Sequence, residues 1–215
     1  MTVLALDTSS EFGSLAIRSN GRTILEIALH SPEGFAHRIF AAIENLLSQA
    51  AVGLEDIDCF AASSGPGSFT GVRVGLAVVK GLAEATGKPA VGISNLQALS
   101  SFGSSPLRAV VLDARRGHVY AAVYDPNLQP VVAEAVLKLP AWLESLDAPE
   151  YQFISPLGPA ILGETRFAEM PFLEPPLSLA PAVAYCAQGA AWLDPAALDA
   201  NYVRRADAEL FWTEA

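Results

Sequence analysis

The sequence predicts an α/β fold built in two halves, and two observations carry this prediction. Along residues 1–85 the pattern is hairpin, strand, helix, strand and helix, which is typical of a mixed sheet flanked by helices. The chain also resembles itself: Leu4–Asp7 and the alternating strand after it match Val110–Asp113 and the strand after that. Any two hairpins can look alike by chance, but this pair stands at the start of each half, which favours duplication. We therefore expect each half to open with a β-hairpin of a mixed sheet.

The first half is expected to begin with three antiparallel strands. An apolar run from Val3 to Leu6 ends at Asp7, and the next strand alternates around Leu15. Asn20-Gly21 is a strong two-residue hairpin signal, so residues 23–28 form the return strand.

Two amphipathic helices come next. Ile39, Ile43 and Leu46 recur at helical spacing and predict a helix to residue 50, closed by Gly53. After a buried strand at residues 59–62, a second helix is predicted from about residue 70 to residue 85.

The second half is rich in proline, which predicts a small and loop-rich lobe. Strands are predicted near residues 109–113, 117–124 and 131–137, after a linker at residues 101–106. Pro181 begins a last helix that runs to about Leu193. The expected boundaries are residues 1–103 for the first lobe, 104–180 for the second, and 181–215 for a helix and tail that return to the first. Residues 140–180 carry no recognisable site.

Composition narrows the possible classes of protein. The 215 residues are 52% hydrophobic, with 13 Lys and Arg against 23 Asp and Glu, for a net charge of −10. That charge repels nucleic acid at long range, so direct binding to tRNA is disfavoured and a partner is expected to supply any basic surface. No run approaches the ~18 apolar residues that a membrane helix needs, and the two cysteines lack metal-ligand or disulfide spacing. A cytoplasmic protein without membrane contact is expected.

The segment Gly65-Pro66-Gly67-Ser68 joins a strand to a helix, where an anion could meet free backbone N–H groups. It lacks the Lys-Ser/Thr of a Walker A loop and the order of a nucleophile elbow. We therefore interpret Gly65 and Gly67 as turn residues and Ser68 as a helix N-cap.

Three glycines within the next helix, Gly71, Gly75 and Gly81, each cost roughly 1 kcal/mol against alanine. Gly71 and Gly75 share one face, which would let another helix approach closely. Two alternatives stay open: packing against the chain's own amphipathic helix, or an intermolecular bundle. The second predicts that Gly75→Leu leaves the monomer folded and weakens association.

Two strand-end loops could bind an anion. Asp7, Thr8 and Ser9 stand where the actin, Hsp70 and sugar-kinase superfamily approaches nucleotide phosphates, although an Asx turn is the simpler interpretation. In the second half the matching loop holds Arg115 and Arg116 where that superfamily has glycines. These arginines either bind an anion through their side chains or cap the hairpin, and they argue against autonomous ATP hydrolysis.

No catalytic residue and no metal site is predicted. The histidines, His30, His37 and His118, form no pair at helical metal-ligand spacing. No His or Asp is placed near Ser68 in the sequence to activate it as a nucleophile.

The sequence resembles the TsaB (YeaZ) family of tRNA threonylcarbamoyladenosine biosynthesis proteins. The resemblance is carried by four segments: Leu4–Ser9, Gly65–Gly75, Asp113–Tyr120 and Asn201–Arg205. Ala200 departs from the family, whose members often have proline there, and this affects only the local turn.

The resemblance implies a two-lobed actin/Hsp70/sugar-kinase-like (ribonuclease H-like) fold. It also implies a non-catalytic scaffold that pairs with a TsaD-like paralogue, acts with a TsaE-like ATPase, forms a homodimer when alone and meets tRNA only through the complex. Partner contacts would come from the first lobe's helices, at Ile39, Ile43, Leu46, Gly71, Arg73 and Gly75. No intrinsic cofactor is implied, and ATP or ADP at the interface with partner subunits stays open.

Two other functions compete with this one. A nucleotide-binding ATPase or kinase would centre on Asp7 and Thr8. A glycoprotease-like peptidase would need a metal or an activated nucleophile.

Overall fold

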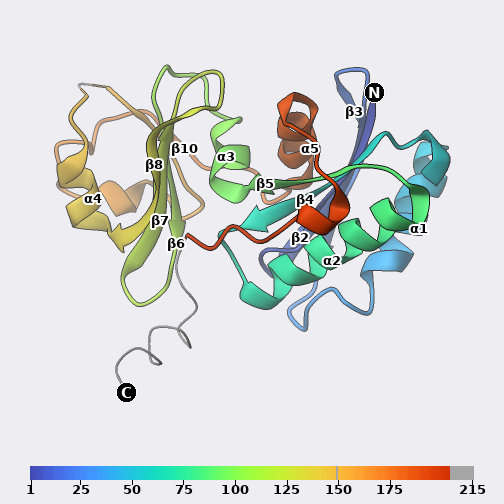
Figure 1. Ribbon diagram of the computed structural model, residues 1–215. Coiled ribbons are helices and arrows are strands. Elements are labelled where there is room, and N and C mark those ends of the chain that lie inside the picture. The colour runs from blue at the N-terminus through green and yellow to red at the C-terminus, as the bar shows by residue number, and fades with distance from the viewer. Residues whose placement is uncertain (149, 204–215) are drawn as a thin grey trace. The chain divides into compact units, whose positions relative to one another are not determined.

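The protein, described here by a computed structural model, forms two compact units (Figure 1). The structure describes residues 1–148 and 150–203. Among the described residues, unit 1 comprises residues 1–98 and 176–200, and unit 2 comprises residues 99–148, 150–175 and 201–203.

Unit 1 is built on a five-stranded mixed sheet of order β3-β2-β1-β4-β5. β1 pairs antiparallel with β2 and β2 with β3, whereas β4 and β5 run parallel to β1. The strands are β1 (Thr2–Asp7), β2 (Phe12–Ser19), β3 (Arg22–His30), β4 (Cys59–Gly65) and β5 (Ala90–Ser94). The predicted opening of three antiparallel strands is confirmed.

Helices cover both faces of this sheet (Figure 1). α1 (Ile39–Ala50) and α2 (Phe69–Thr86) share one hydrophobic core with alternate residues of β1 and β2, including Leu4, Leu6 and Leu15. The amphipathic pattern thus placed both helices correctly. α1 ends at Ala50, as predicted, but Gly53 does not close it. Ala51 adopts a left-handed conformation and its N–H donates to the carbonyl oxygens of Leu47 and Ser48, while Gly53 lies beyond it before the 3-10 turn η1 (Leu54–Asp56).

α5 (Ala180–Gly189) packs on β1 and β2 through small residues. Its N-terminus is held by a distant side chain, since Ser14 Oγ of β2 accepts hydrogen bonds from the N–H groups of Leu179 and Ala180, at 3.0 and 2.9 Å. The prediction that this helix reaches Leu193 is wrong. Leu193 instead exchanges two backbone hydrogen bonds with Ala90 and so covers the edge of β5, before the 3-10 turn η3 (Pro195–Ala197).

Unit 2 repeats the topology of unit 1. Its sheet has the order β10-β9-β6-β7-β8, with β6, β7 and β8 antiparallel and β9 and β10 parallel to β6. The strands are β6 (Arg108–Asp113), β7 (His118–Tyr124), β8 (Pro130–Lys138), β9 (Gln152–Ile154) and β10 (Phe172–Leu173). The internal similarity between the two hairpins therefore reflects a shared strand order.

The helical elements of unit 2 are short. α3 (Asn95–Ser100) leads the chain into the unit, α4 (Leu139–Ser145) comes after β8, and the 3-10 turn η2 (Pro159–Leu162) lies between β9 and β10. An aromatic core of Trp142, Tyr151, Phe153 and Phe167 packs against the sheet. The three strands predicted for this half are confirmed as β6, β7 and β8, and each predicted end lies within one residue of the observed end. The sequence did not predict α4, β9 or β10.

Candidate functional site

The loop after β1 is closed by a buried hydrogen-bond network. Asp7 is 3% exposed, and its Oδ1 accepts from Ser63 Oγ at 2.6 Å and from the backbone N–H of Ser9 at 3.0 Å. The second of these bonds is the Asx turn. The geometry thus favours that interpretation of Asp7-Thr8-Ser9, because their polar groups already have partners within the chain.

The loop after β4 is tied to the same network. Asn95 Nδ2 donates to Ser9 Oγ at 2.6 Å, and Asn95 Oδ1 accepts from Gly65 N at 3.2 Å. Gly65 has φ +103°, a conformation that favours glycine. A Cβ on Gly67 would lie 2.7 Å from the carbonyl oxygen of Ser9, so only glycine lets the two loops approach. Gly67 lies in the turn, as predicted, whereas Gly65 is the last residue of β4.

Helix α2 rests directly on this loop. Thr8 Oγ1 donates to the carbonyl oxygen of Gly71 at 2.7 Å. A Cβ on Gly71 would collide with the carbonyl oxygen of Thr8, and one on Gly75 would lie 2.6 Å from Thr8 Oγ1. Both alternatives for this glycine face are therefore corrected, because the loop after β1 occupies the space beside Gly71 and Gly75 and leaves no room there for another helix.

The start of α2 is capped as the sequence predicted. Ser68 Oγ accepts from the N–H of Gly71 at 3.2 Å, and Ser68 N donates to the carbonyl oxygen of Ser9 at 2.7 Å. The helix N-terminus where an anion could have bound is thus fastened to the loop after β1.

The outer surface of α1 and α2 differs from the face that the sequence suggested. Ile39, Ile43 and Leu46 lie in the hydrophobic core, so these three cannot meet a partner without unfolding α1. Of the predicted partner residues, Arg73 of α2 is exposed, and the sequence missed two exposed aromatic residues, Phe40 of α1 at 57% and Phe69 of α2 at 48%.

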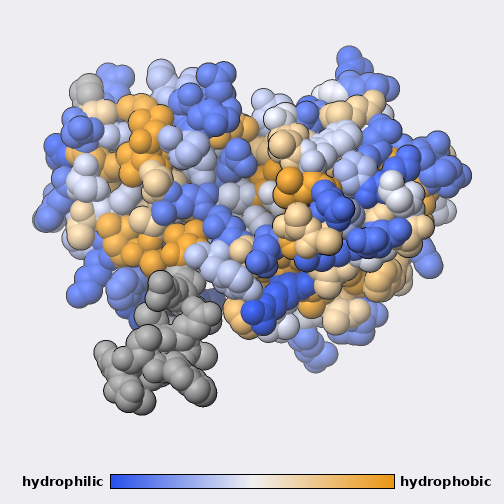
Figure 2. All heavy atoms as spheres, viewed as in Figure 1, coloured by the Kyte–Doolittle hydropathy of each residue, from blue (hydrophilic) through white to orange (hydrophobic). Residues whose placement is uncertain are grey.

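Along α2, Phe69, Arg73, Ala77 and Gly81 recur every four residues on the outer face. The guanidinium of Arg73 stacks over the Phe69 ring at 3.7 Å from its centre. A Cβ on Gly81 would meet open space. Within the described residues, no contact therefore explains why α2 has a glycine at residue 81, where it lowers helix stability. Figure 2 shows hydrophobic and charged residues interleaved over this part of unit 1.

The matching loop of unit 2 is exposed. Arg115 and Arg116 stand at the tip of the β6–β7 hairpin, and the side chain of Arg115 is 88% exposed. Asp113 Oδ1 accepts from the backbone N–H of Arg115 at 2.8 Å, and Asp113 Oδ2 lies 3.7 Å from Arg115 Nη1. The two arginines therefore end the hairpin at exposed positions, with Arg115 beside the carboxylate of Asp113.

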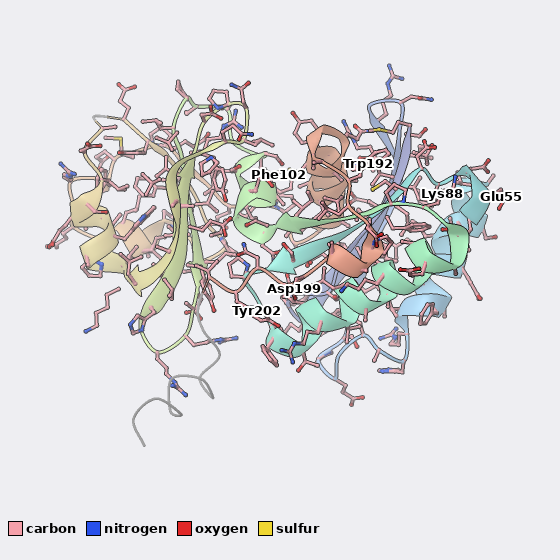
Figure 3. All side chains as sticks on the ribbon, in the orientation of Figure 1. Glu55, Lys88, Phe102, Trp192, Asp199 and Tyr202 are labelled. Carbon is pink, nitrogen blue, oxygen red and sulfur yellow. The ribbon has the colours of Figure 1, made fainter. Side chains whose placement is uncertain are left out.

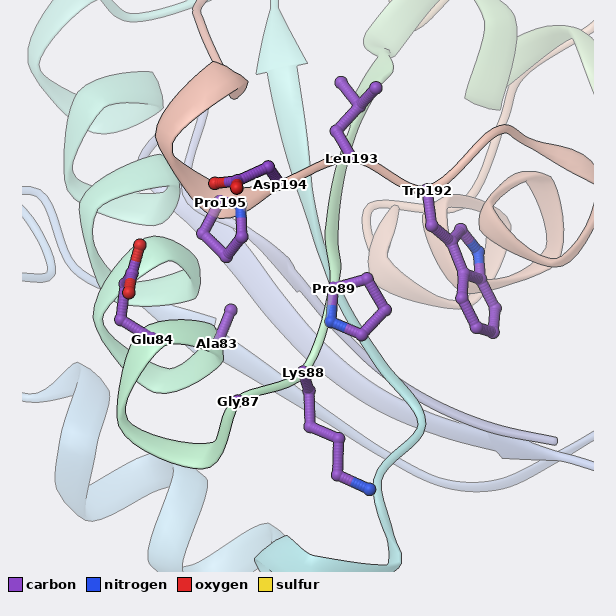
Figure 4. Close-up of a pocket in the computed structure, with 9 residues that line it drawn as sticks. All are labelled: Ala83, Glu84, Gly87, Lys88, Pro89, Trp192, Leu193, Asp194 and Pro195. Carbon is purple, nitrogen blue, oxygen red and sulfur yellow. The ribbon is translucent and has the colours of Figure 1, made fainter.

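A shallow pocket of about 420 Å³ lies where the end of α2 meets the start of β5 and residues 192–195 (Figure 4). Glu84 and Asp194 contribute carboxylates, but Lys88 extends away from them and donates to the carbonyl oxygen of Glu55 at 3.4 Å (Figures 3 and 4). The polar groups that line this pocket do not converge on one point.

The remaining reactive side chains offer little chemistry. Burial raises the pKa of the Cys59 thiol to about 12, with a smaller contribution from the charge of Asp58, and burial likewise raises the pKa of Cys186 to about 12. Both thiols are thus protonated at neutral pH and buried away from solvent. Within residues 1–148 and 150–203 no group of three His, Cys, Asp or Glu residues is arranged to hold a metal, and no helix is long and apolar enough to cross a membrane.

Comparison with known proteins shows which family this chain resembles in sequence and structure. The family model described as TsaD, tRNA N6-adenosine threonylcarbamoyltransferase, matches residues 30–190. The chain is 32% identical over 151 residues to the tRNA threonylcarbamoyladenosine biosynthesis protein TsaB of Bacillus subtilis, and 34% identical over 147 residues to that of Escherichia coli. The structure of YeaZ from Pseudomonas aeruginosa superposes with a TM-score of 0.73 at 27% identity, covering 94% of this chain and 99% of that one. The chain belongs to the TsaB/YeaZ family.

The family membership and the two-lobed actin/Hsp70/sugar-kinase-like fold predicted from the sequence are confirmed. The alignments cover 68% and 64% of this chain, and 66% and 63% of the B. subtilis and E. coli TsaB proteins. The match thus extends over somewhat less than two thirds of the length of these curated relatives.

Sequence reasoning missed several residues that shape this TsaB/YeaZ-family chain. Ser63 and Asn95 complete the network around Asp7, and the only signal for Ser63 was a pair of serines at the end of an apolar strand. In unit 2, Glu134 accepts hydrogen bonds from Tyr124 at 2.5 Å and from Asn201 at 2.7 Å. Asn201 begins one of the segments that carried the resemblance, whereas Arg204 and Arg205 of the same segment lie outside the described residues.

Proposed function

We propose that this chain is a non-catalytic scaffold subunit in the synthesis of tRNA N6-threonylcarbamoyladenosine. It pairs with a TsaD-type paralogue that carries the catalytic site and acts with a TsaE-type ATPase, in a cytoplasmic complex. When alone, it forms a homodimer. ATP or ADP bound in the complex would then lie against the partner subunits.

The observation that carries this proposal is the closed loop after β1. In kinases and ATPases of this fold, nucleotide phosphates approach that loop, but here Thr8 and Ser9 are covered by Gly71, Gly75 and Ser68. Opening the loop would break the bonds of Asp7 and Thr8 and separate α2 from the sheet. The loop therefore supports α2 instead of binding phosphate.

The outer face of α2 supports the choice of pairing surface. An exposed Phe69–Arg73 stack followed by Ala77 and Gly81 combines an aromatic anchor with small residues that let a second helix approach. An exposed glycine in a helix interior costs roughly 1 kcal/mol, and a partner helix close to Gly81 would offset that cost.

Sedimentation and gel filtration, with and without a TsaD-type protein from the same organism, test the pairing. The wild-type chain is expected to be a dimer alone and to exchange into a heterodimer when that protein is added. Reconstitution with the TsaE-type ATPase, ATP and tRNA should give modified tRNA, whereas the chain alone should give none. A wild-type chain that stays apart from the TsaD-type protein, or one that alone binds ATP with submicromolar affinity in calorimetry, would contradict the proposal.

Gly81→Leu tests the surface. We expect a melting temperature no lower than that of the wild-type chain, because leucine favours a helix over glycine. We expect about tenfold weaker pairing, because the leucine side chain would hold the partner helix away. Gly189→Leu is the matched control, since a Cβ at Gly189 of α5 also meets open space, but on the opposite face of the sheet. Equal pairing by the two variants would show that partners bind elsewhere.

A further inference from the structure

Three of the cations of residues 99–175 lie at one end of the unit 2 sheet. Residues 99–175 hold five Lys or Arg residues, namely Arg108, Arg115, Arg116, Lys138 and Arg166. Two of them serve the fold: Arg108 is buried and donates to the carbonyl oxygens of Ser100 and Ser105, and Arg166 donates to that of Leu146. The other three are exposed.

Strand pairing brings these three together with a histidine. Arg115 and Arg116 form the turn between β6 and β7, and His118 at the start of β7 stands directly opposite Lys138 at the end of β8. Side chains opposite one another on paired strands have Cβ atoms about 5 Å apart. We call Arg115, Arg116, His118 and Lys138 the basic tip.

The backbone of the basic tip is strained in a way that keeps the arginines in place. Arg115 has φ +64° and Arg116 has φ +53°, followed by Gly117 at φ +74°. Hairpin turns with positive φ normally use Asn, Asp or Gly, and a side chain in this region costs on the order of 1 kcal/mol. Two arginines thus occupy positions that glycine would fill at lower cost, which points to a role for their side chains.

The shape and charge of the basic tip suit an extended polyanion. The tip is the convex end of a hairpin, with Arg115 almost fully exposed, whereas small nucleotides bind in concave pockets. Guanidinium groups match phosphate oxygens in geometry and charge. In a chain of net charge −10, such a patch attracts phosphates locally although the whole chain repels them.

We propose that the basic tip contacts the phosphate backbone of tRNA when the chain is assembled with its partners. This inference rests on the proposed function, which brings tRNA to the complex. It changes the expectation that tRNA is met only indirectly: the partner supplies most of the affinity, and this chain adds a few phosphate contacts that position the RNA.

Binding of fluorescently labelled tRNA to the complex of this chain with a TsaD-type protein, measured by anisotropy over a range of salt concentrations, tests the inference. We expect Arg115→Gln/Arg116→Gln to raise the Kd about tenfold at low salt and to reduce the slope of log K against log salt by about two. Arg22→Gln/Arg38→Gln is the control, because it removes the same charge from exposed positions of unit 1.

The possible outcomes separate the inference from the proposed function. If the wild-type complex does not form, both fail together. If it forms and the two double variants bind tRNA equally well, only the role of the basic tip is overturned. If Arg115→Gln/Arg116→Gln abolishes co-elution with the TsaD-type protein, the tip is a protein contact, and the RNA assignment is likewise overturned.

Discussion

The two units open with the same hairpin, yet the loops at their first turns have opposite surroundings. In both, an aspartate at the end of the first strand closes an Asx turn: Asp7 Oδ1 accepts from Ser9 N at 3.0 Å, and Asp113 Oδ1 accepts from Arg115 N at 2.8 Å. Asp7 is then buried beneath α2, whereas Asp113 remains exposed at the tip of its hairpin.

The difference arises from the element that the chain forms after the fourth strand of each sheet. In unit 1, β4 leads into α2, an 18-residue helix whose glycines allow it to cover the loop. In unit 2, β9 leads only into the four-residue turn η2. The same turn therefore supports a helix in one unit and stays exposed, carrying charge, in the other.

The largest expected effect separates the two kinds of glycine in α2. Gly71→Ala should destabilise unit 1 by about 3 kcal/mol, because the new Cβ meets the carbonyl oxygen of Thr8, which the loop network holds in place. Gly81→Ala should stabilise it by roughly 1 kcal/mol, since it gains helix propensity without a contact. Denaturant melts followed by circular dichroism measure both values.

The reactivity of the buried thiols gives a second measure of how the glycine substitutions in α2 change the stability of unit 1. Because Cys59 and Cys186 are buried, which also raises their pKa values to about 12, they should react with a thiol reagent at pH 8 only when unit 1 opens. A loss of about 3 kcal/mol corresponds to roughly 100-fold faster labelling in Gly71→Ala, at about 1.4 kcal/mol per factor of ten. Equal labelling of the wild-type chain and Gly71→Ala would mean that α2 does not rest on Thr8 as described.

A smaller effect compares the two aspartates directly. Asp7→Ala should cost about 2 kcal/mol, because it leaves the Ser63 hydroxyl and the Ser9 N–H buried without their acceptor. Asp113→Ala should cost about 0.5 kcal/mol or less, since water can replace an exposed acceptor. Thermal unfolding of both variants at neutral pH tests this, and similar losses would show that burial does not distinguish the two loops.

These differences mark the limit of what the sequence alone can predict. Apolar periodicity placed α1 and α2 correctly, because a helix with one apolar stripe has a single way to face a sheet. It did not show what lay against Gly71 and Gly75, because a glycine face reveals only that something is close. The partner there is a loop 63 residues earlier in the chain.

The expected test with Gly75→Leu changes for the same reason. With Thr8 Oγ1 2.6 Å from the position of its Cβ, a leucine at residue 75 would disrupt the monomer itself, so weakened association would say nothing about the interface. Gly81 was available from the sequence as the third glycine. Only the structure shows that it faces solvent.

The smallest expected effect tests whether the positive φ of an arginine in the exposed loop lowers the stability of the chain. Arg116→Gly should raise the stability of the chain slightly, by less than about 1 kcal/mol, because relief of the strain at φ +53° exceeds the greater freedom that glycine has in the unfolded chain. Arg22→Gly is the control, because Arg22 is the first residue of β3 and does not have a positive φ. This substitution should lower the stability of the chain instead. The free energy of unfolding from urea melts gives the sign in each case. A stabilised Arg116→Gly variant that also binds tRNA more weakly would show that the arginine is present for its charge and at the expense of the fold.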